Sequence, residues 1–207
     1  MKKINKVVIC ILFFIFCVMA VLVHFQLTEA FDETIYKFVI GFKGDALTKT
    51  LLFITNFASV KGIVCLCVIS LIGLFWKYYK SLFLVLNVIV STIFNVVLKN
   101  IMMIPRPSVL RLTEETGYSF PSGHSMASVA FYGFVLYVVL SSNMNKTLKM
   151  VLSSLLVILI LVIGFSRIYL GVHNASDVIA GQVLSTGLLL TNISILKKKG
   201  LVKWRLW

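Results

Sequence analysis

Charged side chains are scarce in this sequence of 207 residues. Asp, Glu, Lys and Arg together make up 13%, hydrophobic residues make up 59%, and the mean hydropathy is +1.01. A soluble domain carries about 25% charged residues. A core of this size cannot bury so many apolar side chains, but a lipid bilayer can surround them. The apolar runs are continuous rather than alternating, which argues against a membrane β-barrel. We therefore predict an all-α polytopic membrane protein.

Acidic residues are rarer still, with 7 against 20 basic residues and a net charge of +13. In a soluble protein this excess would favour nucleic acid as a partner, but in a membrane protein the position of each charge decides. With six spans threaded from a cytosolic N-terminus, the cytosolic side receives no acid and 12 basic residues: Lys2, Lys3, Lys6, Lys77, Lys80, Lys146, Lys149, Lys197, Lys198, Lys199, Lys203 and Arg205. Basic residues favour the cytosolic side. We predict that both termini are cytosolic and that the partner is the bilayer, not nucleic acid.

Cysteine is limited to four positions, Cys10, Cys17, Cys65 and Cys67, and all four lie within apolar runs. We expect these cysteines to be small buried apolar side chains. Their spacing fits neither a disulfide framework nor a set of metal ligands. We predict no bound metal and no cofactor.

Six apolar stretches are long enough, or nearly so, to cross about 30 Å of hydrocarbon. They cover residues 7–27, 59–76, 81–103, 122–140, 148–168 and 175–196. The first exceeds the apolar core of a signal peptide, about 7–15 residues, so we predict a retained helix. Repeats and linkers are lacking, which predicts a single domain over residues 1–207.

Residues 28–57 lie on the outer side, where residues 46–57 are compatible with an interfacial amphipathic helix. This segment either covers the site or lies on the headgroups.

Ionisable residues at the ends of membrane spans are costly, and are therefore functional candidates. On the predicted topology they collect at the outer ends of spans three to six. The set comprises Lys99, Arg106, Arg111, His124, Arg167, His173 and Asp177.

A Pro-Ser-Gly-His run opens the fourth span, from Pro121 to His124. A proline suits the first turn of a helix, and Gly123 lets the backbone approach a ligand closely. The unpaired N–H groups of this turn and the Ser122 hydroxyl are suited to bind an anion. His124 lies in the same turn.

His173 and Asp177 are four residues apart, so they share one face if this segment is helical. A carboxylate beside a histidine accepts the proton of Nδ1 and leaves Nε2 as nucleophile or base. The spacing therefore favours a catalytic pair over a helix cap beside a surface histidine.

Three motifs resemble the signature of the type 2 phosphatidic acid phosphatases, also called lipid phosphate phosphatases. They are Lys99 with Arg106-Pro107, then Pro121 to His124, and finally Ser166-Arg167 with His173 and Asp177. All three occur in order and at the family's spacing, within residues 99–177. The resemblance implies six helices and metal-independent hydrolysis of a phosphate ester or anhydride.

The resemblance also implies a role for each residue. His173 is expected to form a phosphohistidine, Asp177 to orient it, and His124 to protonate the leaving group. The residues expected to bind the phosphoryl oxygens are Lys99, Arg106, Arg167, Ser122 and Gly123. These roles fit the chemistry, because phosphoryl transfer depends largely on positioning and on positive charge around the phosphoryl oxygens.

Two other functions compete with this one: a metal-dependent hydrolase, and an anion-binding or lipid-binding transporter without hydrolysis. Three cationic side chains oppose a divalent ion, and the doubled halves of many transporters are not evident. We therefore predict a phosphatase in a bacterial plasma membrane, with its site on the extracytoplasmic face. In such a membrane the resemblance implies undecaprenyl pyrophosphate as the favoured substrate, followed by phosphatidylglycerol phosphate and phosphatidic acid. The sequence does not indicate an oligomeric state.

Overall fold

Long helices account for the apolar stretches, and the computed structural model describes them over residues 6–72 and 78–198. Five helices are long and apolar enough to cross a membrane. They are α1 (Lys6–His24), α5 (Tyr78–Met102), the helix from Gly123 to Leu140, α8 (Lys146–Tyr169) and α9 (Ala175–Lys198). A bent pair, α3 (Asp45–Asn56) and α4 (Val60–Ile72), provides a sixth if its two helices count as one span. No strand occurs in the described ranges, and the predicted all-α membrane fold is confirmed.

The outer segment contains two helices, whereas the sequence predicted one. The helix expected at residues 46–57 is α3, but a second helix, α2 (Glu29–Ile40), precedes it and was not predicted. The axes of α3 and α4 differ by 48°. The predicted second span, residues 59–76, is covered by α4 only as far as Ile72. Residues 73–77 lie outside the described ranges, as do Lys2, Lys3 and the basic residues after position 198.

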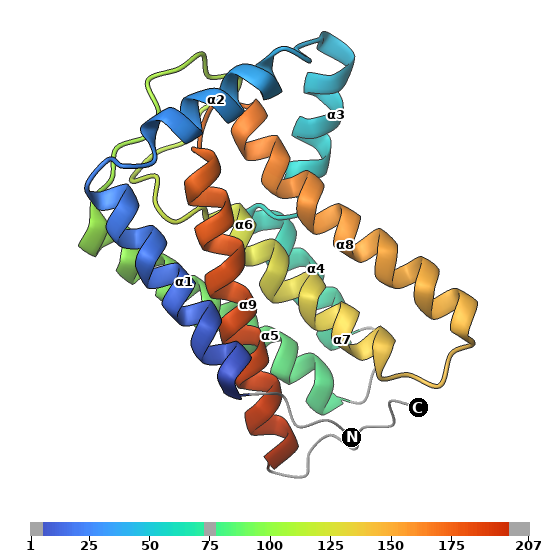
Figure 1. Cartoon of the computed structure of the whole chain (residues 1–207). Coiled ribbons are helices and arrows are strands. Elements are labelled where there is room, and N and C mark those ends of the chain that lie inside the picture. The colour runs from blue at the N-terminus through green and yellow to red at the C-terminus, as the bar shows by residue number, and fades with distance from the viewer. Residues whose placement is uncertain (1–5, 73–77, 199–207) are drawn as a thin grey trace.

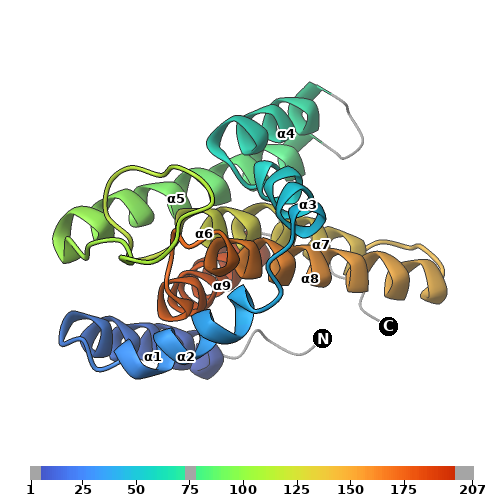
Figure 2. The same ribbon diagram turned by 90° about the horizontal axis from the view of Figure 1, so that it is seen from above.

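Two helices form the centre of the bundle, namely α9 and the helix from Gly123 to Leu140 (Figures 1 and 2). Around them, α1 packs against α9, while α5 and α8 flank both central helices and α4 packs on α5. The start of α1 and the end of α9 lie at the same end of the bundle (Figure 1). At the opposite end lie α2, α3 and the loop that joins α5 to the helix from Gly123 to Leu140, which is called the central helix below. The candidate site residues therefore gather at the end away from Lys6 and Lys198.

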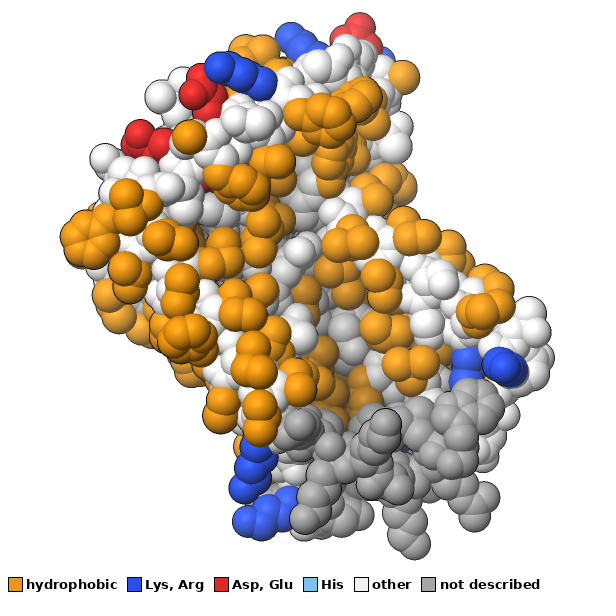
Figure 3. All heavy atoms as spheres, viewed as in Figure 1, with side chains coloured by type: hydrophobic (Ala, Val, Ile, Leu, Met, Phe, Trp, Pro, Cys, Tyr) orange, Lys and Arg blue, Asp and Glu red, His pale blue; other side chains and the backbone are white. Residues whose placement is uncertain are grey.

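Apolar side chains cover the outside of the bundle along its length (Figure 3). Cys10, Cys17 and Cys65 are among the exposed residues, and only Cys67 is buried. The expectation that all four cysteines are buried in the protein was therefore wrong for three of them. A helix face that meets lipid is as apolar as one that meets the core, so composition does not distinguish the two.

The central helix contains one π-helical turn. It begins as α6 (Gly123–Ser128), passes through η1 (Val129–Gly133) and continues as α7 (Phe134–Leu140). The Asn87 amide nitrogen donates to the carbonyl oxygen of Ala130 at 2.7 Å, and the Asn192 amide donates to the oxygen of Asn87 at 2.7 Å. Backbone groups within a bilayer must be paired inside the protein. These side chains meet that need and tie the helix that starts at the site to α5 and α9.

Candidate active site

The turn between α8 and α9 carries the histidine of the third motif, and a glycine makes the turn possible. Gly171 has a φ of +70°, and a Cβ there would lie 2.2 Å from the carbonyl oxygen of Leu110. Only glycine tolerates both the left-handed backbone and this close approach. The Leu112 N–H also donates to the carbonyl oxygen of Leu170 at 3.0 Å. The loop after α5 is thereby held against the turn that presents His173.

His173 and Asp177 lie together as predicted, but a serine that was not predicted lies between them. His173 Nδ1 is 3.5 Å from Asp177 Oδ2 and 3.2 Å from the hydroxyl of Ser119. Ser119 in turn donates to Asp177 Oδ2 at 2.6 Å, and the backbone N–H of Asn174 donates to the same oxygen at 2.9 Å. His173, Asp177 and Ser119 are all buried. The carboxylate therefore acts on the imidazole both directly and through Ser119.

Arg106 contacts the other nitrogen of the same imidazole. Its Nη1 lies 3.2 Å from His173 Nε2 and donates to the carbonyl oxygen of Val172 at 2.9 Å. Its Nε and Nη2 donate to the carbonyl oxygens of Gly117 and Thr116 at 3.1 and 2.8 Å. Backbone oxygens from two segments thus hold this guanidinium against His173.

The other two basic residues of the motifs, Lys99 and Arg167, lie in the last turns of α5 and α8. Lys99 donates to the carbonyl oxygens of Tyr118 and Ser119, the latter at 3.2 Å. Arg167 is 1% exposed, and its Nη1 donates to the hydroxyl of Thr55 on α3 at 3.0 Å. Its Nε is buried and has no hydrogen-bond partner among the residues that the structure describes. A guanidinium this deeply buried needs a compensating anion.

The Pro-Ser-Gly-His run starts the central helix, with a small difference from the prediction. Pro121 precedes the helix, Ser122 is its N-cap, and Gly123 is its first residue. The Ser122 hydroxyl accepts from the backbone N–H of Ser125 at 3.4 Å and from its hydroxyl at 2.9 Å. Ser122 is fully buried, whereas Gly123 and His124 line the cavity described below. The serine therefore shapes the turn, and the next two residues face the open space.

Glu115 is a site residue that the sequence did not reveal. Its Oε1 accepts a hydrogen bond from Arg167 Nη2 and lies 3.9 Å from His124 Nδ1, and its Oε2 lies 3.9 Å from Arg106 Nη2. One carboxylate thus contacts residues from all three motifs. The sequence has two adjacent glutamates in this loop, Glu114 and Glu115, and no pattern distinguishes them.

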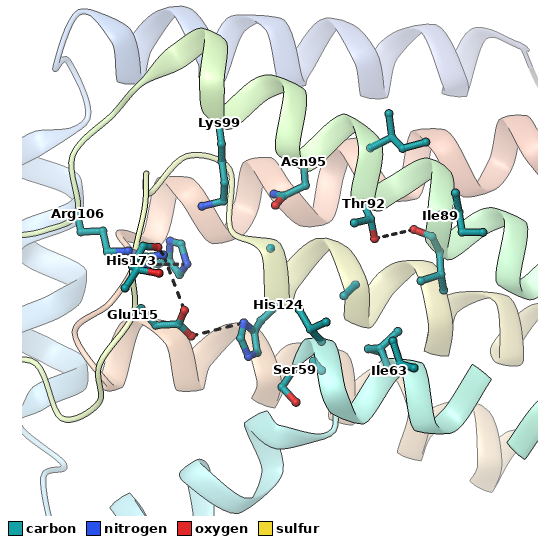
Figure 4. A pocket seen from close by; sticks show the side chains of 18 residues that line it. Ser59, Ile63, Ile89, Thr92, Asn95, Lys99, Arg106, Glu115, His124 and His173 are labelled. Carbon is teal, nitrogen blue, oxygen red and sulfur yellow. Dashed lines mark hydrogen bonds and ion pairs between the residues drawn. The ribbon is translucent and has the colours of Figure 1, made fainter. Parts of the chain in front are cut away.

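Five of these side chains line one end of a cavity of about 470 Å³ between α4 and α5, whereas Arg167, Ser122 and Asp177 lie outside its lining. Figure 4 shows Lys99, Arg106, Glu115, His124 and His173 at its polar end. The opposite end is lined by apolar residues, including Ile63, Val64, Val88, Ile89 and Ile93. Such a cavity accommodates an anionic group joined to an apolar chain. Within the described ranges, no three His, Cys, Asp or Glu side chains are grouped so as to hold a metal ion.

The outer segment also contacts the site, through α2 and through α3. Asp32 on α2 is buried, and its carboxylate accepts from the backbone N–H of Ser176 at 2.8 Å and from the Ser176 hydroxyl at 2.7 Å. Ser176 lies in the first turn of α9, directly before Asp177. Together with the hydrogen bond that Arg167 donates to Thr55, this contact shows that residues of the outer segment bind directly to residues of the site.

Burial sets the protonation of the imidazole. It lowers the pKa of His173 to about 4, with Arg106 and Arg167 acting in the same direction and Asp177 opposing them. His173 is therefore neutral near pH 7, and a neutral imidazole has the lone pair that a nucleophile requires.

The chain is similar to known proteins over most of its length. It is 34% identical over 183 residues to phosphatidylglycerophosphatase B of Bacillus subtilis. This match covers 86% of this chain and 89% of that protein. It is 24% identical over 202 residues to an undecaprenyl-diphosphatase of Sulfolobus acidocaldarius, covering 94% and 93% of the two chains. The crystal structure of a transmembrane PAP2-type phosphatidylglycerolphosphate phosphatase from Bacillus subtilis matches with a TM-score of 0.82 and 27% identity, covering 99% of this chain and 100% of that one. Residues 80–200 match the PAP2 superfamily model, and these residues include all three motifs. The chain belongs to the PAP2 superfamily.

Proposed function

We propose that this protein is a membrane lipid phosphatase that removes the terminal phosphate of a lipid phosphate or diphosphate, with His173 as its nucleophile. One observation carries the proposal: a buried histidine lies at the cationic end of a cavity whose other end is apolar. A lipid phosphate has the same division between an anionic head and an apolar tail. Membership of the PAP2 superfamily and similarity to lipid phosphatases support this reaction class.

In the proposed first step, the lone pair of His173 Nε2 attacks phosphorus while the bond from phosphorus to the leaving oxygen breaks. His124, which the step requires in its protonated form, gives a proton to that oxygen, and the products are a phosphohistidine and the lipid alcohol or lipid monophosphate. In the second step water attacks phosphorus, His124 accepts a proton from it, and His173 and phosphate are released. Dividing the displacement into two steps is the usual advantage of a covalent intermediate.

The phosphoryl oxygens carry the charge that develops in both steps, and we assign their binding to Lys99, Arg106, Arg167 and the Gly123 N–H. Arg106 and Arg167 are held by bonds to the protein, so little reorganisation is needed when the phosphate arrives. Ser122 belongs to the set as the cap that fixes the turn containing Gly123. Positive charge from side chains also supports hydrolysis without a metal ion.

Chemistry and similarity together support a ranking of the candidate lipids. Undecaprenyl pyrophosphate, phosphatidylglycerol phosphate and phosphatidic acid all present a terminal phosphate on an apolar anchor. The 34% identity to a phosphatidylglycerophosphatase raises phosphatidylglycerol phosphate to the level of undecaprenyl pyrophosphate, which the sequence alone favoured. We propose these two lipids as the leading substrates and phosphatidic acid as the third.

We further propose that the site faces the outside of a bacterial plasma membrane. The sidedness of the basic residues supports this orientation. A cysteine introduced at the exposed Glu114 tests it in intact cells with an impermeant thiol reagent, after the four natural cysteines have been replaced by alanine or serine. Labelling without permeabilisation is expected, whereas labelling only after permeabilisation would reverse the topology.

The decisive experiment measures phosphate release by purified wild-type and His173→Ala protein with a chelator present. The panel consists of undecaprenyl pyrophosphate, phosphatidylglycerol phosphate and phosphatidic acid. Activity that is lost only in the variant supports a metal-free histidine phosphatase, and the order of kcat/KM ranks the lipids. Activity that the chelator abolishes would favour the metal-dependent alternative. Binding of the lipids without release by either protein would favour the transporter.

A further inference from the structure

A carboxylate of the protein lies among the groups assigned to phosphate. Glu115 accepts a hydrogen bond from Arg167 and lies 3.9 Å from both Arg106 and His124 through its two oxygens (Figure 4). It lines the same cavity as His173. Guanidinium groups bind carboxylates and phosphates through the same donors. The protein's own carboxylate therefore uses donors that a bound phosphate needs.

Each arginine has hydrogen bonds besides its contact with Glu115. Arg167 is also bonded to Thr55, and Arg106 is also bonded to three backbone oxygens. Glu115, in contrast, is 29% exposed and is carried by the loop between α5 and the central helix. The guanidinium groups are thus the fixed part of this ion-pair cluster, and the carboxylate is the part that can exchange.

We propose that Glu115 is an internal substitute for phosphate. In the resting protein its carboxylate neutralises Arg167 and Arg106, it withdraws when the phosphoryl group of the substrate arrives, and it returns as inorganic phosphate leaves. This proposal rests on the proposed function, since it assumes that the cluster binds phosphate. Its consequence is weak retention of the product: a free phosphate must compete with a carboxylate that is tethered beside the site.

A purely supporting role for Glu115 predicts the opposite effect. If Glu115 only held Arg167 in place, its neutralisation would disorder the guanidinium and weaken the binding of every anion. If Glu115 competes with phosphate, the same change strengthens that binding. The sign of the change therefore separates the two roles.

The test compares Glu115→Gln with Glu114→Gln, which makes the same charge change one residue away on an exposed side chain. Two quantities are measured in detergent at constant ionic strength: the Ki of orthophosphate as an inhibitor, and the Kd of orthophosphate obtained from the rise of Tm with its concentration. We expect both to fall about tenfold in Glu115→Gln, because one unit charge at about 4 Å has been removed, and to stay at the wild-type values in Glu114→Gln. Unchanged or raised values in Glu115→Gln would overturn the proposal.

A second variant, Glu115→Asp, and the thermal measurement provide controls for folding and for catalysis. Glu115→Asp retains the charge but shortens the side chain, so its values should fall between those of wild type and Glu115→Gln, and it replaces that variant if Glu115→Gln does not fold. The thermal measurement does not require catalysis. If the wild type releases no phosphate from any lipid, the proposed function fails, while the effect of orthophosphate on Tm still decides whether Glu115 competes with it.

Discussion

Arg106 Nη1 lies 3.2 Å from His173 Nε2, and this contact identifies the nitrogen that carries the imidazole proton. A guanidinium has only donors, so Nε2 must be the acceptor. The proton of the neutral ring is then on Nδ1, which lies 3.2 Å from the Ser119 hydroxyl. Because Ser119 donates its own proton to Asp177, its oxygen is free to accept from Nδ1. The tautomer required for attack through Nε2 is therefore already present in the resting protein.

The first prediction concerns the charge of this ring. Burial lowers the pKa of His173 to about 4, so the ring should remain neutral down to about pH 5 and gain a proton only below that. The chain has three histidines, so ¹⁵N-histidine labelling gives a small set of ring signals, and His173→Gln identifies the one of interest. A neutral signal with the proton on Nδ1 is expected from pH 8 to pH 5. Half-protonation at pH 6.5 or above would contradict it.

Much of this arrangement could be predicted from the sequence, because the motifs specify which residues meet and the apolar runs specify the helices. The helix start at Pro121 to Gly123 and the pairing of His173 with Asp177 are local, since each depends on residues within one or two turns. The neighbours that complete the site are distant in sequence. Asp32 and Ser176 are 144 residues apart, and Thr55 and Arg167 are 112 apart.

Ser119 and Glu115 escaped prediction for a different reason. Both lie in the loop between two motifs, and a serine or glutamate in an outer loop has no periodicity that reports its direction. The path of this loop is determined by tertiary contacts, such as the bond from Leu112 to Leu170 and the close approach of Leu110 to Gly171. Those contacts form only when α8 and α9 are in place.

The second prediction is that Asp177→Asn retains the fold and loses most of its activity. An amide can still accept from the Asn174 N–H, but it no longer attracts the Nδ1 proton or stabilises positive charge on the ring. We expect kcat to fall by about 10³-fold or more, with little change in Tm. Near-normal turnover in this variant would show that Asp177 does not orient His173.

The third prediction concerns the leaving group. His124→Ala should reduce kcat for a phosphate monoester by about 10²-fold or more, because an alkoxide leaves poorly without a proton. The loss should be about tenfold for a lipid diphosphate, whose leaving phosphate needs less protonation. Phosphatidic acid and undecaprenyl pyrophosphate provide the comparison, with the same purified protein in the same detergent. Equal losses on both lipids would exclude His124 as the proton donor.

The last prediction concerns Asp32, which we assign as a positioning residue for the catalytic pair. Its carboxylate accepts two hydrogen bonds from Ser176, so it caps the turn of α9 that contains Asp177. Asp32→Ala removes both bonds, and the loss of a helix cap costs about 0.5–2 kcal/mol. We expect kcat to fall about tenfold with little change in KM, because Asp177 and His173 lose their alignment while the cationic groups remain.

Asp32→Asn separates this role from a general effect of charge. Its amide oxygen can accept from the Ser176 N–H, and its amide nitrogen can donate to the Ser176 hydroxyl, so both bonds have a replacement. Activity should therefore return to near the wild-type level in Asp32→Asn. Glu33→Ala is the matched control, because Glu33 lies next to Asp32 and forms an exposed ion pair with Lys37, and such pairs contribute little. Equal loss of kcat in Asp32→Asn and Asp32→Ala would mean that the charge, rather than the cap, matters. Equal activity in Asp32→Ala and Glu33→Ala would mean that α2 only covers the site.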